Sequence, residues 1–215
     1  MTRKVEFMSD SLYERIIREC VENSCGTVHL HNFGEPLLDK KLEQRIMYAK
    51  SSGIPRVKIF SNGSLLTENR ARNLIKAGLD EIKVSFDGTT TEEFEGIRTP
   101  LKYDVVVENI RKLVKLRNEE RSSMKVFVAC CSTQNRSETM NLIASEVDGF
   151  SFGKIHNWGG GDLTITNPQT VCACLEYVYD SRKWRRGVML PGSRWTCGSG
   201  TLGRKNKHSR HFYWC

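Results

Sequence analysis

The chain has 215 residues, of which 39% are hydrophobic and 27% charged, and its mean hydropathy is −0.45. This is the composition of a globular protein, and no stretch reaches the roughly 18 consecutive apolar residues that a membrane-spanning helix needs. The formal charge of +8 suggests a polyanionic partner, but nine bases and one acid lie in 180–215, so residues 1–179 are neutral. Residues 1–10 lack the apolar core of a secretory signal, and we expect a cytoplasmic protein.

Amphipathic helical segments alternate with short β-rich runs up to about residue 154. Ser9 and Thr67 are predicted N-caps, because a hydroxyl side chain at that position accepts a hydrogen bond from the first helical turn. Apolar residues at helical spacing give the inward face of each segment. The predicted helices are one after Ser9 (Leu12, Ile16, Cys20, Val21 inward), one from Asp39 (Leu42, Ile46), one after Thr67 (Leu74, Ile75), 91–97, one from Asp104 (Val106, Ile110, Leu113) and 136–145.

Five β-rich runs separate these helices. They lie at 27–31, 56–60, 81–85, 125–131 and 150–154. In repeated strand–helix units the strands pair in parallel, because each crossover helix returns the chain to the same edge of the sheet. The sequence therefore predicts an α/β fold with a parallel sheet.

Small polar clusters stand at the ends of three successive predicted strands. Gly34-Glu35-Pro36-Leu37-Leu38 follows the first, Ser61-Asn62-Gly63 the second, and Ser85-Phe86-Asp87-Gly88 closes the third. Each of the latter two, taken alone, is typical of an ordinary turn. In parallel βα folds, however, ligands bind at the carboxyl ends of the strands. The recurrence of such clusters at three strand ends therefore indicates a binding site.

In their order and spacing these clusters resemble those of radical S-adenosylmethionine (radical SAM) enzymes, particularly members with a C-terminal SPASM extension. The resemblance covers roughly residues 5–179. It implies a partial (β/α)6 TIM-like barrel whose [4Fe–4S] cluster, held by a CxxxCxxC loop, cleaves S-adenosylmethionine to a radical that takes a hydrogen atom from the substrate. It also implies a peptide or small-molecule substrate, a reductant such as flavodoxin or ferredoxin, and neither a nucleic-acid nor a membrane partner.

The resemblance assigns cofactor contacts to eight residues: Gly34, Glu35, Pro36, Ser61, Asn62, Ser85, Asp87 and Arg98. The first three match the motif whose backbone meets the amino group of the cofactor. The serine–asparagine pair is expected near its carboxylate or ribose, and the later serine and aspartate match groups that hydrogen-bond the ribose hydroxyls. The arginine stands where the family often has a basic residue near the carboxylate, and a solvated cation at a helix end is the alternative.

The family's first strand and its three-cysteine loop are missing from this sequence. Cys20 and Cys25 flank the end of a predicted helix, Cys130 and Cys131 are adjacent, and no three of the eight cysteines have the spacing CxxxCxxC. We interpret Cys20 and the adjacent pair as buried free thiols. We therefore expect a chain that begins late within the family's fold, is inactive by itself, and leaves the edge of strand 27–31 unpaired.

Cys174 fits the first auxiliary-cluster ligand of a SPASM extension, as a possible metal ligand. The expected continuation is a β-hairpin and a cysteine-rich turn, whereas residues 180–215 contain only two cysteines, Cys197 and Cys215. If synonymous codons are chosen for the residues from Tyr179 onward and are read one base later, they permit a continuous open reading frame. That frame encodes an Asn-Gly hairpin turn and a Cys-Cys pair. We favour a frameshift near 179–181 over a genuine basic tail.

Three regions follow: a partial radical SAM barrel at 1–158, the start of a SPASM-like extension at 159–179, and a basic irregular tail at 180–215. His156, Asn157 and Trp158 follow the last predicted strand, and we predict that they contact the substrate over the barrel mouth. A flexible glycine loop with an anchoring tryptophan is the alternative.

Two other functions stay open beside the radical SAM interpretation. A nucleic-acid-binding protein would use the basic tail, with Trp184, Trp195 and Tyr213 stacking on bases and with affinity that falls steeply with salt. A pseudoenzyme would still bind S-adenosylmethionine as a ligand. In the leading interpretation S-adenosylmethionine is the cofactor, and the [4Fe–4S] cluster belongs to the full-length parent and not to this chain.

Overall fold

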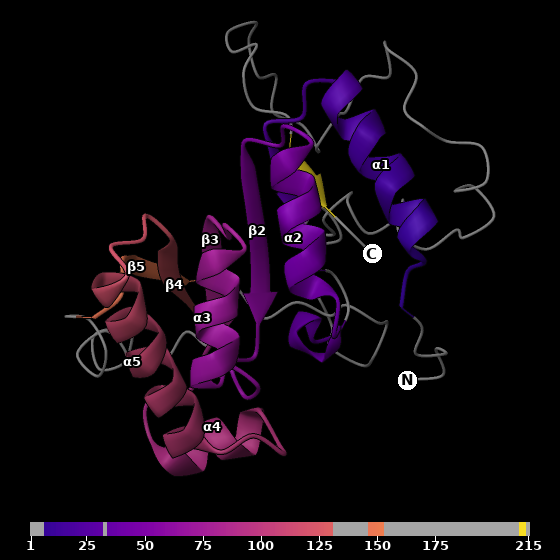
Figure 1. Ribbon diagram of the computed structural model, residues 1–215. Coiled ribbons are helices and arrows are strands. Elements are labelled where there is room, and N and C mark those ends of the chain that lie inside the picture. Colours follow the sequence, from indigo (N-terminus) through magenta and orange to yellow (C-terminus); the bar gives the residue numbers. More distant parts are fainter. Residues whose placement is uncertain (1–6, 32–33, 131–145, 153–210, 214–215) are drawn as a thin grey trace, which may run out of the picture. The chain divides into compact units, whose positions relative to one another are not determined.

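A parallel β-sheet is the centre of the structure, a computed structural model that describes residues 7–31, 34–130, 146–152 and 211–213 (Figure 1). Its strands stand in the order β5-β4-β3-β2-β1-β6, and every neighbouring pair is parallel. The strands are β1 (Thr27–His29), β2 (Arg56–Ser61), β3 (Glu81–Ser85), β4 (Lys125–Cys130), β5 (Gly149–Phe152) and β6 (His211–Tyr213). The predicted α/β class with parallel strands is confirmed.

The sixth strand overturns one expectation about the sheet edge. We expected the edge of strand 27–31 to be unpaired, but β6 pairs with β1 in parallel, with Thr27 opposite His211 and His29 opposite Tyr213. A three-residue pairing between segments this distant leaves no periodic signal in the sequence, because the tail has no strand-like pattern of its own. Backbone groups of β1 thus have partners on both sides.

Helix α1 (Asp10–Glu22) precedes β1, and α2 (Leu42–Ser51), α3 (Glu68–Lys76), α4 (Thr91–Ile97) and α5 (Tyr103–Glu119) connect β1 to β4 in turn, with a 3-10 turn, η1 (Pro36–Leu38), after β1. Ser9 caps α1 by accepting from the Leu12 amide, and Thr67 caps α3 by accepting from the Arg70 amide, as predicted. The helix expected from Asp39 begins only at Leu42. The predicted helix at 136–145 lies outside the described residues.

The buried face of α1 differs from the predicted one. Val21 is 38% exposed, whereas Tyr13 and Ile17 are buried beside Ile16 and Cys20. Residues 13, 16, 17 and 20 form the usual stripe of an amphipathic helix, and position 21 lies on its flank. Tyr13 is compatible with burial because its hydroxyl donates to the Arg45 carbonyl at 2.6 Å.

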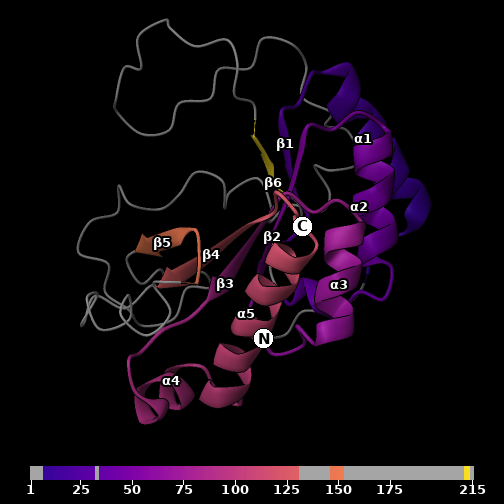
Figure 2. The same cartoon turned by 60° about the vertical axis from the view of Figure 1, so that its left-hand side comes forward.

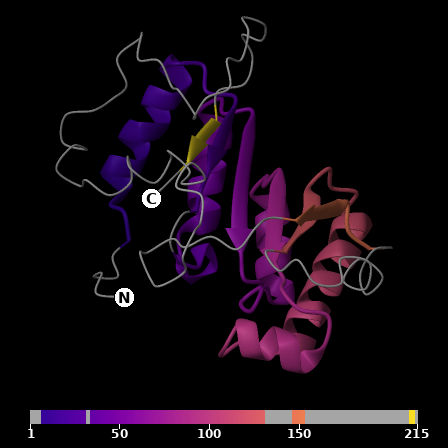
Figure 3. The same cartoon turned by 180° about the vertical axis from the view of Figure 1, so that it is seen from behind.

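The helices that the structure describes cover one face of the sheet, and none of them covers the other. Strand residues on the covered face are almost fully buried: Val28, Val57, Ile59, Ile82, Val84, Val126 and Val128. In Figures 1 and 2 helices α2, α3 and α5 lie on this side, and from behind (Figure 3) the strands lie in front of them. Alternate residues of β2, β3 and β4 therefore point to the second face, where they are only partly buried. None of the helices in the described ranges is long and apolar enough to cross a membrane.

Candidate functional site

The Glu35 carboxylate joins the loops that follow β1 and β2. Its Oε1 accepts from the Leu37 amide at 3.0 Å and from Ser61 Oγ at 2.8 Å, and its Oε2 accepts from the Asn62 amide at 2.7 Å. Ser61 is 3% exposed, so this contact is shielded from water. Hydrogen bonds to an ionised carboxylate are stronger than neutral ones, and the two loops are therefore held in one arrangement.

The backbone around Glu35 is shaped by its neighbours in sequence. Gly34 has φ 107°, in the left-handed region that glycine adopts without strain, and its added Cβ would meet nothing within 4 Å. Pro36 occupies the first position of η1, where its missing N–H is no loss. The Glu35 side chain is thus engaged within the protein, where it holds the loop after β1 in place.

Two further contacts hold the loop after β2. Asn62 Oδ1 accepts from the Ser64 amide at 2.9 Å and from Ser64 Oγ at 2.8 Å. From α5, the buried Asn109 donates to the Gly63 carbonyl at 2.9 Å. Sequence reasoning missed Asn109, although a polar residue three positions after Val106 on the predicted inward face of a helix was the signal for it.

Asp87 and Arg98 form an ion pair at the carboxyl end of β3. Asp87 is 4% exposed, and its carboxylate accepts from Arg98 Nη2. Arg98 caps the C-terminus of α4, so this short helix brings it back toward the strand end. Arg98 Nε is buried and has no hydrogen-bond partner among the described residues. The pair therefore presents a fixed guanidinium with a donor still available.

Gly88 makes the turn after Asp87 possible. Its φ is 95°, and an added Cβ would lie 2.7 Å from the Phe94 amide nitrogen. Backbone of α4 thus approaches the strand end more closely than any side chain would allow.

The remaining predicted residues are placed less tightly. Ser85 ends β3, half-buried on the face that none of the described helices covers, opposite Ala129 of β4. The structure thus joins Glu35 with Ser61 and Asn62, and Asp87 with Arg98, at neighbouring strand ends. His156, Asn157, Trp158 and Cys174 lie outside the described residues.

His31 and Lys83 are two residues that sequence reasoning did not single out. His31 follows β1, and its ring lies 4.6 Å from the Phe60 ring. Burial, with a smaller contribution from the Lys83 charge, lowers the pKa of His31 to about 4, so the imidazole is neutral at pH 7. The aromatic neighbours of both residues lie on adjacent strands. Strand pairing brings them together, and a local sequence motif does not reveal it.

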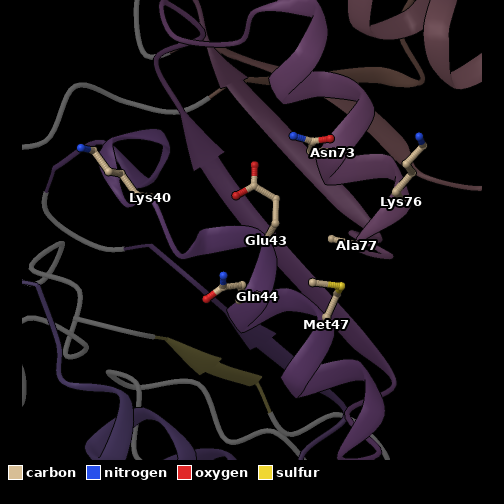
Figure 4. Close-up of a pocket in the computed structure, with 7 residues that line it drawn as sticks. All are labelled: Lys40, Glu43, Gln44, Met47, Asn73, Lys76 and Ala77. Atoms are coloured by element: carbon tan, nitrogen blue, oxygen red, sulfur yellow. The ribbon is translucent and has the colours of Figure 1, made fainter.

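A pocket of about 260 Å³ lies between α2 and α3, away from these residues (Figure 4). It is lined by Lys40, Glu43, Gln44, Met47, Asn73, Lys76 and Ala77. None of the predicted cofactor contacts belongs to it. The residues proposed for binding thus lie instead at the strand ends, where parallel βα folds place ligands.

A [4Fe–4S] cluster does not fit the side chains that the structure describes. Cys20, Cys25 and Cys130 are buried and form no disulfide among the described residues, and within the same ranges no three cysteine, histidine or carboxylate side chains gather as a metal site. Burial raises the pKa of the Cys20 thiol far above its usual range, and the neighbouring Cys25 raises it further, which disfavours the thiolate that iron requires. For Cys20 and Cys130 the predicted burial is confirmed.

The family pattern of the radical SAM superfamily matches residues 1–144. The chain belongs to the radical SAM superfamily. Among its relatives, a probable GTP 3',8-cyclase of Metallosphaera sedula is 32% identical over 111 residues, which are 52% of this chain and 34% of that protein. An S-adenosyl-L-methionine-dependent 2-deoxy-scyllo-inosamine dehydrogenase of Niallia circulans is 29% identical over 93 residues, 42% of this chain and 37% of that one. This radical SAM chain thus matches about a third of the length of these curated relatives.

A solved structure of native anSMEcpe with bound AdoMet shares the fold. Its TM-score is 0.54 at 13% identity, over 73% of this chain and 45% of that one. At this identity the likeness shows the fold alone, and it supports the partial TIM-like barrel that the resemblance implied.

Proposed function

We propose that the loops after β1, β2 and β3 bind S-adenosylmethionine, and that the whole protein uses it for hydrogen-atom abstraction from a small-molecule or peptide substrate. The observation that carries the proposal is the Glu35 bridge. It fixes the backbone of Gly34 and Pro36 beside Ser61 and Asn62, where the resemblance puts the amino group and the carboxylate or ribose of the cofactor.

The Asp87–Arg98 pair supports the second half of the same site. A carboxylate has about four acceptor positions, and ribose hydroxyls are donors of the kind that such a group accepts. The available Nε donor of Arg98 suits the carboxylate of the cofactor. With Ser85 at the end of β3, the set offers donors and acceptors that match the polar groups of S-adenosylmethionine.

S-adenosylmethionine cleavage needs an electron from the family's cluster, which the described residues do not fit. We therefore propose that this chain binds the cofactor but performs no radical chemistry by itself. In the whole protein, a reductant such as flavodoxin or ferredoxin would supply electrons in the cytoplasm. The names of the relatives, a probable GTP 3',8-cyclase and a 2-deoxy-scyllo-inosamine dehydrogenase, favour a small molecule over a peptide as the substrate.

Titration calorimetry of the full chain with S-adenosylmethionine tests the binding. We expect saturable binding that Asp87→Asn weakens by about tenfold, equivalent to ~1.4 kcal/mol. Asn73→Ala, in the pocket between α2 and α3, is the matched control and should leave the affinity unchanged. Absence of binding, or equal binding by the two variants, would contradict the proposal.

Anaerobic iron–sulfur reconstitution tests the absence of radical chemistry. We expect no stoichiometric [4Fe–4S] spectrum from this chain, and such a spectrum would overturn that part. Binding of an oligonucleotide that falls steeply with salt and is lost on deletion of 180–215 would favour the nucleic-acid-binding alternative instead.

A further inference from the structure

The second face of the sheet, which none of the described helices covers, carries charged and aromatic side chains. On β2 and β3 the positions that alternate with the buried valines and isoleucines include Lys58, Phe60, Glu81 and Lys83. Phe127 of β4 shares this face, because Val126 and Val128 on either side of it are fully buried. A surface of mixed charged and aromatic character thus lies next to the predicted cofactor contacts.

Lys83 stands between two aromatic rings on this face. Strand register puts Phe60 and Phe127 directly opposite Lys83 on either side. The Lys83 ammonium lies 5.3 Å from the Phe60 ring centroid and 5.8 Å from the Phe127 centroid. Both are cation–π contacts, which hold the ammonium in place without neutralising its charge.

The carboxylate of Glu81 lies closer to Lys58 than to Lys83. Glu81 Oε2 lies 2.6 Å from the Lys58 ammonium, whereas Glu81 Oε1 lies 3.8 Å from that of Lys83. Two cations therefore share one anion, and the trio has a net positive charge. His31 adds no charge at neutral pH, because burial lowers its pKa to about 4.

The position of Lys83 relates it to the predicted cofactor site. Ser85 follows Lys83 on the same face of β3 two residues later, a rise of about 7 Å. The Lys83 side chain is 27% exposed, so its ammonium is only partly desolvated and can accept an anionic partner. A molecule seated against a cofactor at the strand ends would reach this ammonium.

We propose that Lys83, positioned by Phe60 and Phe127, binds a carboxylate or phosphate group of the substrate on this second face of the sheet. This inference rests on the proposed function, since it assumes that the substrate meets S-adenosylmethionine at the strand ends. It narrows the substrate to an anionic compound. The aromatic rings on both sides would pack against an apolar or planar part of the same molecule.

Calorimetry of the full chain with inorganic phosphate and, separately, succinate tests the assignment. We expect Lys83→Met to weaken binding of the preferred probe by about tenfold or more, because it removes a charge-assisted contact. Glu81→Gln should strengthen it, since the trio then carries one more net positive charge. Lys115→Met removes an equally positive but 76% exposed side chain on α5 and should change nothing.

Preference for either probe supports the proposal and identifies the group. Equal losses in Lys83→Met and Lys115→Met would overturn it, and so would binding that Lys83→Met does not affect. If Lys83→Met fails to fold by circular dichroism, unchanged or weaker binding by Glu81→Gln overturns it. A parallel titration with S-adenosylmethionine distinguishes the two proposals. If the unsubstituted chain does not bind S-adenosylmethionine, the proposed function is wrong. If the chain binds the phosphate or succinate probe equally well with and without Lys83, only this inference is wrong.

Discussion

Ser61 Oγ donates to Glu35 Oε1 at 2.8 Å across 26 positions of sequence. The bond joins the end of β2 to the loop after β1, and the Asn62 amide strengthens it by donating to the other carboxylate oxygen at 2.7 Å. Two loops that the chain places far apart thereby act as one surface. The proposed contacts of the cofactor depend on that surface, because each loop supplies part of them.

Glu35→Gln should loosen this surface. A glutamine retains one acceptor oxygen but presents an amide N–H₂ to one of the three donors, so a buried donor loses its partner. We expect a loss of about 1–3 kcal/mol in the free energy of unfolding and weaker binding of S-adenosylmethionine. Urea unfolding and calorimetry measure the two effects.

The control for this substitution is Glu14→Gln, which removes the same charge from an exposed position of α1. It should change the stability by no more than about 0.5 kcal/mol. Equal effects of the two substitutions would show that the charge matters and the bridge does not.

Sequence patterns predicted these helices and strands well, because the signals for a single helix or strand are local in the sequence. The strand at 81–85 and the helix at 91–97 have the predicted bounds, and the caps Ser9 and Thr67 are in place. A cap or an amphipathic stripe is read within one or two turns of chain. The core residues of α3 and α5 followed from the same periodicity.

Features that depend on pairing between distant segments were not predictable. The Phe60–Lys83–Phe127 row exists only because the register of three strands brings those residues together. The sequence does not show which loop Asn109 or Glu35 holds by its hydrogen bonds. Motif matching found the strand-end residues, but their hydrogen bonds required the structure.

Gly88→Ala should be one of the most damaging single substitutions in this part of the chain. The new methyl group would lie 2.7 Å from the Phe94 nitrogen, and alanine would have to adopt φ 95°. We expect a loss of about 2 kcal/mol or more in the free energy of unfolding, since backbone cannot move aside as a flexible side chain can.

Gly96→Ala is the matched comparison because it lies in α4 with nothing within 4 Å of an added Cβ. Alanine is the better helix former by about 1 kcal/mol, so thermal unfolding should shift upward. A similar loss of stability in both variants would contradict the close approach at Gly88.

Asp87→Asn should leave the Arg98 guanidinium without its counter-charge. Removing one partner of a mostly buried pair costs more than removing both, so we expect a loss of about 2–3 kcal/mol in Asp87→Asn and a smaller one in Asp87→Asn combined with Arg98→Met. Urea unfolding of the two single variants and the double variant gives the coupling energy. Additive effects, with no coupling, would show that the pair is not formed.

The imidazole of His31 makes stability depend on pH in a direction that follows from its burial. Its pKa is lowered from 6.5 to about 4 in the folded chain, so between these values the unfolded chain binds a proton that the folded chain does not. Stability is therefore full at pH 7 and falls as the pH drops from 6.5 toward 4. A shift of one pKa unit corresponds to about 1.4 kcal/mol, which predicts a loss on the order of 2 kcal/mol between pH 7 and 4.5. Urea unfolding at the two pH values measures it.

His31→Phe keeps a ring beside Phe60 and removes the titrating group, so the pH-dependent loss of stability in this variant should be smaller by that amount. Carboxylates such as Asp148, whose pKa is lowered by hydrogen bonds and by Arg117 and Lys125 despite partial burial, contribute equally to both proteins and cancel in the difference. Identical losses in the variant and the unsubstituted chain would mean that His31 is not buried as described.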